Sequence, residues 1–239
     1  MDERRLLAAA GDLGESPLLP AAALIAAAGL YADLPSRFIV GPGGGAFGVV
    51  RWVVPALTLF VLATFFVIRP HGRLVRAYGW GERSLHLTRR RLALLSIGFV
   101  SAANSASIVL LIHLLVNGAS TQSASTLLRA ALHMWAVNVL LFGLWYWQLD
   151  GGGPVDRQTC APHQRDFLFP QHTEPALAES GWHPEFLDYL YVSFTNAAAF
   201  SPTDTMPLSR WAKMLMLVQS AISLALAVMV VARAVNILR

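Results

Sequence analysis

Residues 51–69 read RWVVPALTLFVLATFFVIR, an apolar run bracketed by Arg51 and Arg69. A helix rises about 1.5 Å per residue, so roughly 20 apolar residues cross the hydrocarbon core of a bilayer, which is about 30 Å thick. The run matches that length and carries no charge between its ends. It therefore predicts a membrane-spanning helix.

Four other apolar runs extend this prediction to a bundle. Three are long, and the fourth, PLLPAAALIAAAGLYA, is short and rich in alanine. Trp145, Tyr146 and Trp147 end one of the long runs, as suits side chains at the lipid headgroup level. The expected fold is an all-α polytopic transmembrane helix bundle forming one membrane domain, residues 1–239, with spans at about 17–32, 51–69, 92–116, 127–148 and 211–237 and a long loop at 150–209.

Composition agrees with a membrane protein. Of the 239 residues, 55% are hydrophobic and 13% are charged, against about 25% charged in soluble domains. Arginine supplies nearly all the positive charge, Lys213 being the one lysine, and the wealth of alanine, leucine and glycine is typical of a bacterium with a GC-rich genome. We therefore expect a bacterial inner-membrane protein whose first partner is the lipid bilayer. No basic stripe with interleaved aromatic residues indicates nucleic acid.

The charges between the spans predict an orientation. Residues 70–91 carry six arginines and one acid, whereas residues 117–126 carry no charge. Because short cytoplasmic loops are enriched in arginine and lysine, residues 70–91 and the N-terminus are expected in the cytoplasm. Two spans separate residues 70–91 from residues 150–209, so the long loop is expected on that side too, although its two arginines and eight acids would suit the outer face.

The long loop contains one short helical segment. It begins LDGGGP, a helix stop, and its first half has no periodicity. Residues 184–199 follow Trp182 and open with Pro184 and Glu185, which suit a first helical turn. The segment has an apolar side but is too short to span. We expect a re-entrant or interfacial half-helix.

The order of half-helix, turn and long final helix resembles the pore-loop region of cation channels. Ser193, Phe194 and Thr195 match the Ser-Phe-Thr of the pore helix in that family, and Asp204 falls where those channels place the aspartate after the filter. Where the family has Thr-Val-Gly-Tyr-Gly, this chain has residues 199–203, Ala-Phe-Ser-Pro-Thr. A potassium filter needs glycines for its carbonyls to face the ion, so selective potassium conduction is not expected.

The same part of the chain resembles a family of uncharacterised small bacterial inner-membrane proteins more closely. The similarity lies in residues 188–191, Asp-Tyr-Leu-Tyr, then Phe194-Thr195, Asp204-Thr205 and a late asparagine, Asn236. It implies a five-helix membrane protein and carries over no established activity.

Several polar residues are candidate functional positions. Asn104, His133 and Asn138 lie within predicted spans, where polar side chains usually face the bundle interior; they could form interhelical hydrogen bonds or a polar pathway. Asp204 could cap the final helix or the turn before it, or attract cations. The residues that would line a pathway at the half-helix and its turn are Thr195, Asn196, Ser201, Thr203, Asp204 and Thr205.

Signals for cofactors and catalysis are weak. Cys160 is the only cysteine, which excludes a disulfide within the chain. Residues 43–48 spell a G-x-G-x-x-G, but no strand–helix–strand context surrounds it. No metal-ligand spacing or known catalytic motif is present, so we expect no cofactor, no metal site, no catalytic residues and no enzymatic activity. Three functions stay open. The sequence favours a channel- or transport-like homo-oligomer over the alternative, an accessory or structural membrane protein without transport, and it favours a membrane enzyme least.

Overall fold

The structure, a computed structural model, consists mainly of helices. It describes residues 16–40, 51–67, 82–116, 123–154, 156–158, 161–199 and 204–237. Ser201 and Thr203, two predicted pathway residues, and Cys160 lie outside these ranges. The chain divides into two compact units: residues 1–20 with 142–224, and residues 21–141 with 225–239.

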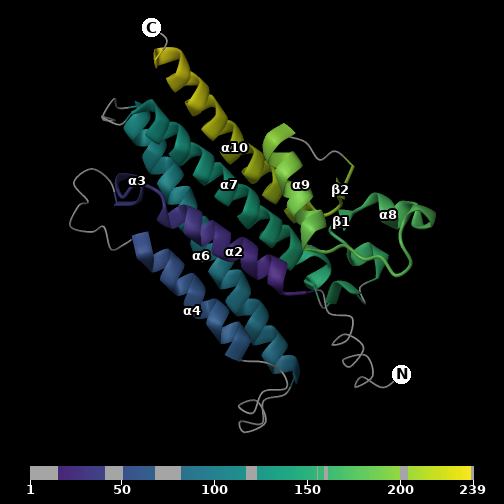
Figure 1. The fold of residues 1–239 in the computed structure, drawn as a ribbon. Helices are drawn as coiled ribbons and strands as arrows, with labels where there is room; N and C mark the ends of the chain where they lie inside the picture. Colours follow the sequence, from purple (N-terminus) through teal and green to yellow (C-terminus); the bar gives the residue numbers. More distant parts are fainter. Residues whose placement is uncertain are drawn as a thin grey trace. The chain divides into compact units, whose positions relative to one another are not determined.

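Three described helices are long and apolar enough to cross a membrane. They lie within α6 (Glu82–Val116), in α7 (Ala124–Leu149) together with the short turn after it, and within α10 (Arg210–Ile237) (Figure 1). The other two predicted spans correspond to α2 (Leu18–Ala32) and α4 (Val53–Val67), each with 15 helical residues. The predicted helical fold is thus confirmed, and three of the five predicted spans meet the length that a bilayer requires.

Helix α6 begins earlier than its predicted span. The sequence placed residues 82–91 in the basic connection, yet they continue the same helix as residues 92–116. Arginine is a good helix former, so a polar extension costs little where nothing breaks the helix. In the unit of residues 21–141, α4 and the short α3 (Arg37–Val40) pack against α6.

Polar contacts join the helices within that unit. The amide of Asn104 on α6 donates to the carbonyl of Met134 on α7 at 3.3 Å. His133 Nδ1 lies 3.4 Å from the carboxylate of Asp33, just after α2. Asn138 is 2% exposed. The three polar residues predicted to face the bundle interior are therefore buried or, in the case of His133, mostly covered.

The other unit, residues 1–20 with 142–224, contains the end of α7, the loop after it, α9 (Phe186–Ala199) and the first part of α10. Helix α7 stops as predicted at the glycine triplet, where Gly151, Gly152 and Gly153 all have positive φ. On α7, a Cβ at Gly143 would lie 3.2 Å from the Leu190 Cα of α9. The glycine therefore lets these two helices approach closely.

The long loop is more ordered than its sequence suggested. Its first half, predicted as loop without periodicity, contains short 3-10 turns, a helix α8 (Pro170–Thr173) and a strand β1 (Phe167–Leu168). Strand β1 pairs antiparallel with β2 (Met206–Pro207), Phe167 opposite Pro207. This small ladder was not predicted. It ties residues before α9 to residues directly before α10.

Candidate functional site

Aromatic side chains form the core of the loop region. Tyr146 from α7, Phe167 from β1 and Tyr189 from α9 are fully buried. The Phe167 ring lies 5.2 Å from that of Tyr146 and 6.1 Å from that of Tyr189. Such tilted and edge-on arrangements are favourable for aromatic pairs. We use the name cap for the region of residues 142–216, which contains the side chains that pack around this core and the loop after α7.

Asp150 is the polar centre of the cap. It follows α7 directly and is 1% exposed. Its Oδ1 accepts the backbone N–H groups of Asp166 at 2.7 Å and Phe167 at 3.2 Å, and its Oδ2 accepts the Tyr189 hydroxyl at 2.5 Å. One carboxylate therefore connects the end of α7 to the start of β1 and to α9.

Arg157 brings a compensating positive charge into the same region. It is 7% exposed, and its Nη1 donates to the carbonyl oxygen of Trp147 at 2.8 Å. Its guanidinium carbon lies 4.8 Å from the centre of the Tyr189 ring, a cation–π distance. A buried charge needs such partners to offset the loss of water. The arginine is held on two sides by the protein.

Asp166 joins the loop after α7 to the final helix. Its Oδ1 accepts the indole N–H of Trp211 at 2.7 Å, and its Oδ2 accepts the backbone N–H of Gly151 at 3.1 Å. Its backbone oxygen accepts the N–H of Leu208 at 2.8 Å. The first turn of α10 is thus tied to the helix stop after α7.

A small cavity of about 150 Å³ opens beside these residues. Its wall combines two arginines and two histidines with a single carboxylate, that of Asp150. The residues lining it are Asp150, Arg157, Arg165, His172, Trp182, His183 and Pro184. Among the described residues, no group of three or more histidine, cysteine, aspartate or glutamate side chains could hold a metal ion.

His172 is held in its neutral form. Burial, together with the smaller effect of the nearby positive charge of Arg165, lowers its pKa from 6.5 to about 4. The Nδ1 atom accepts the backbone N–H of Phe169 at 3.2 Å, so the proton of the neutral ring lies on Nε2. The ring also packs on Trp182, with centroids 5.3 Å apart.

This lowered pKa predicts a pH dependence of stability. Between about pH 6.5 and pH 4, His172 takes up a proton in the unfolded chain but not in the folded protein. The free energy of unfolding that neutral His172 contributes is therefore present above pH 6.5 and is lost as the pH falls towards 4. His172→Asn keeps an acceptor for Phe169 and does not titrate, so its stability should change less across this window. Histidine NMR titration in detergent checks the assignment. A His172 midpoint near 6.5 would contradict it.

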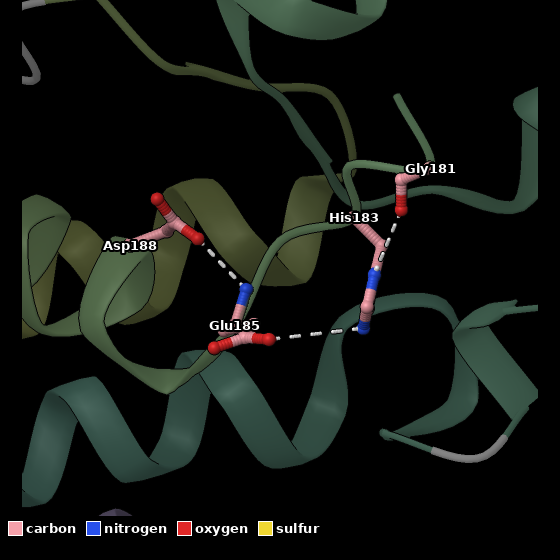
Figure 2. Close-up of polar contacts among 4 residues, drawn as sticks. All are labelled: Gly181, His183, Glu185 and Asp188. Atoms are coloured by element: carbon pink, nitrogen blue, oxygen red, sulfur yellow. Dashed lines mark hydrogen bonds and ion pairs between the residues drawn. The ribbon is translucent and has the colours of Figure 1, made fainter. Parts of the chain in front are cut away.

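The start of α9 carries a second polar cluster (Figure 2). The Asp188 carboxylate reaches back to accept the backbone N–H of Glu185 at 2.7 Å, as a residue in a helix's first turn does in a capping box. His183 lies beside it, with Nδ1 3.3 Å from the Gly181 oxygen and Nε2 4.0 Å from the Glu185 carboxylate. Burial raises the pKa of Asp188, while its bond to Glu185 opposes that shift.

Removing the hydrogen bond from Glu185 to Asp188 should weaken α9 measurably. Asp188→Ala leaves the Glu185 N–H without its acceptor and should cost about 1 kcal/mol of unfolding free energy. Asp188→Asn retains an oxygen acceptor and is the matched control, expected to cost less than half as much. Detergent-phase unfolding monitored by circular dichroism measures both. Equal losses in the two variants would show that charge, and not the hydrogen bond, is what matters at Asp188.

A buried hydrogen-bond network, which we call the Gln219 network, fixes α9 against α7 and α10. Gln219 is 0% exposed, and its Oε1 accepts the Tyr146 hydroxyl at 2.6 Å and the Asn196 amide at 2.8 Å. Its Nε2 donates to both the carbonyl and hydroxyl oxygens of Ser193, at 2.9 and 2.6 Å. Asn196 donates in addition to the Met216 carbonyl at 3.0 Å.

The predicted pathway residues take different positions. Asn196 belongs to the Gln219 network. Thr195 turns its hydroxyl back to its own helix, onto the carbonyls of Tyr191 and Val192 at 3.0 Å each. Asp204 is exposed and Thr205 is buried.

Ser209 caps the start of the final helix. Ser209 Oγ accepts the backbone N–H of Ala212 at 3.3 Å, directly before and within the first turn of α10. A capping role of Asp204 in this helix or in the turn before it stays a prediction. Asp204 accepts a long hydrogen bond, 3.4 Å, from the Thr205 hydroxyl.

Sequence reasoning missed the residues that organise the cap. Asp150 and Arg157 were read as parts of a structureless loop, and Tyr189 as one aromatic residue of the half-helix. The available signal was composition: Asp166, Phe167 and Phe169 form an acidic and aromatic cluster that is unusual in a solvated loop. No protein-family model, curated protein or solved structure matches the chain, so the site has to be interpreted from its own geometry.

Proposed function

We propose that this chain is a five-span protein of a bacterial inner membrane, with its N-terminus in the cytoplasm. Three helices of spanning length support the membrane location. Helices α2 and α4 would complete the five spans, although 15 residues reach only about 22 Å. A bilayer can thin locally to match a short helix. The arginines of residues 70–91 support the orientation.

Within that membrane, the protein acts as an accessory or structural component that neither conducts nor transports. The main observation in favour of this proposal is that polar side chains of α9 are hydrogen-bonded within the protein. Ser193 and Asn196 are hydrogen-bonded in the Gln219 network, and Thr195 is bonded to its own helix. A pathway needs polar groups that can exchange water for an ion. These groups are already engaged within the protomer.

The channel-like alternative has one specific observation in its favour. A half-length helix, the exposed Asp204 and a long final helix follow one another along the chain in the order that pore-loop channels use. That alternative requires a homo-oligomer whose protomers meet around α9, with Thr203 and Asp204 at the pathway. It therefore predicts that changes at these two residues alter ion flux.

Proteoliposome flux separates the two functions. Purified, folded protein is expected to give cation flux no higher than protein-free liposomes, with an added ionophore proving that the vesicles are sealed. Asp204→Asn and Thr203→Ala should leave this background unchanged. Flux above background that either variant alters would overturn the accessory role in favour of the channel.

The orientation has its own test. Ser201→Cys in a Cys160→Ser background gives a single thiol in the turn after α9. By the count of spans from residues 70–91, this thiol should react only when a membrane-impermeant maleimide reaches the cytoplasmic face, in inverted vesicles. Labelling in intact spheroplasts would place residues 186–205 outside and reverse the topology.

A further inference from the structure

We propose that the cavity of the cap binds a phosphate group, either free or as the headgroup of an anionic lipid. The inference goes beyond the accessory role and does not depend on it. Arg165, Arg157 and His183 supply the positive or donor groups of this site, and Trp182 supplies an apolar wall. The cavity volume, about 150 Å³, suits a group of this size better than a nucleotide.

Arg165 is the group that most clearly lacks a partner. Its side chain is half-buried in the cavity wall and makes no hydrogen bond or ion pair with any residue that the structure describes. Its donors are therefore available to a ligand that enters the cavity. Its five donors form a planar fork that matches two oxygens of a phosphate.

Arg157 adds a second guanidinium whose position is already fixed. The Trp147 carbonyl and the Tyr189 ring hold it, so little side-chain entropy remains to be lost when a ligand arrives. The one carboxylate of the wall, Asp150, has both oxygens engaged by protein donors. It is therefore poorly suited to bind a cation in the cavity, and the arginines determine which ligands are preferred.

His183 contributes a donor that protein groups leave unused. Its Nε2 is buried and has no hydrogen-bond partner among the described residues, while Nδ1 faces the Gly181 oxygen. When the ring is protonated, Nδ1–H can donate to Gly181 and Nε2–H can donate to a phosphate oxygen. The Glu185 carboxylate lies 4.0 Å from Nε2.

The place of the cavity in the chain also suits a phosphate at a membrane surface. Asp150 follows directly after the end of α7, a helix of spanning length, and Arg157 comes shortly afterwards, beyond the glycine triplet. Trp182 and Trp147 lie in the same region, and tryptophan is enriched at the headgroup level. A lipid phosphate and a free phosphate present the same oxygens, so the experiment has to distinguish these sources.

Calorimetric titration of the full chain in maltoside detergent tests the proposal. The probes are inorganic phosphate, dihexanoyl phosphatidic acid and dihexanoylglycerol, which lacks the phosphate, all at constant ionic strength. Saturable binding is expected for a phosphate-bearing probe and not for dihexanoylglycerol. Binding of phosphatidic acid alone identifies a lipid headgroup, and binding of inorganic phosphate alone identifies a free anion.

Variants tie the binding to the cavity. Arg165→Gln should weaken binding roughly tenfold or more, because hydrogen bonds to charged groups are the strong ones. Arg165→Lys keeps the charge without the fork and should lose less. Arg210→Gln, an exposed arginine at the start of α10, is the matched control and should leave affinity unchanged. Absence of saturable binding by folded wild-type protein, or equal affinity in Arg165→Gln, would overturn the proposal.

Discussion

Asp150→Ala is expected to destabilise the protein by about 3–5 kcal/mol, the cost of leaving buried partners uncompensated. The substitution removes the acceptor of three donors at once, the N–H groups of Asp166 and Phe167 and the hydroxyl of Tyr189. It also removes a carboxylate that lies near the charge of buried Arg157. The loss should appear in denaturant unfolding in mixed micelles, followed by tryptophan fluorescence.

Two further variants give that result its meaning. Asp150→Asn keeps one oxygen for the backbone donors and lets the Tyr189 hydroxyl turn round to accept, so about half of the loss is expected. Glu174→Gln removes an exposed carboxylate of the same loop and should change stability by less than about 0.5 kcal/mol. If Asp150→Ala lay within about 1 kcal/mol of wild type, the carboxylate would not be the centre of the cap.

The helices could be predicted because their signal is local. Residues 127–148 and 211–237 were expected as spans, and the structure has helices over Ala124–Leu149 and Arg210–Ile237. An apolar run of spanning length and a glycine triplet each act on neighbouring residues, so their consequence can be read along the chain. The half-helix at 184–199 was recovered for the same reason, as Phe186–Ala199.

The cap could not be predicted because its contacts join distant residues. Asp150 meets Tyr189 across 39 positions, and Tyr146 meets Gln219 across 73. Neither pair leaves a periodic pattern, and the two-residue strands are too short for alternation to show. These contacts are stable because the residues are buried, and burial is a property of the assembled unit. Polar residues in an apolar context, such as Gln219 in α10, were a second indication besides the cluster of Asp166, Phe167 and Phe169.

The Gln219 network gives the second large effect. Gln219→Leu keeps a side chain of similar size but removes four hydrogen bonds, two accepted from Tyr146 and Asn196 and two donated to Ser193. At about 0.6 kcal/mol for each bond between helices in a membrane, the loss should be about 2–3 kcal/mol. Because Asn196 retains its bond to the Met216 carbonyl, α9 should loosen but remain helical.

Ser220→Ala is the matched control for this network. Ser220 is the next residue of α10, and its hydroxyl donates to the carbonyl and side-chain oxygens of Asn196, at 3.4 and 3.1 Å. Its removal should cost no more than about 0.6 kcal/mol. Gln219→Leu and Ser220→Ala also test the function. If the network only fixes α9 in place, liposomes containing Gln219→Leu should show no ion flux even though the helix is loosened. Flux that appears only in that variant would mean that Gln219 closes a pathway, and the same hydrogen bonds would then be a gate.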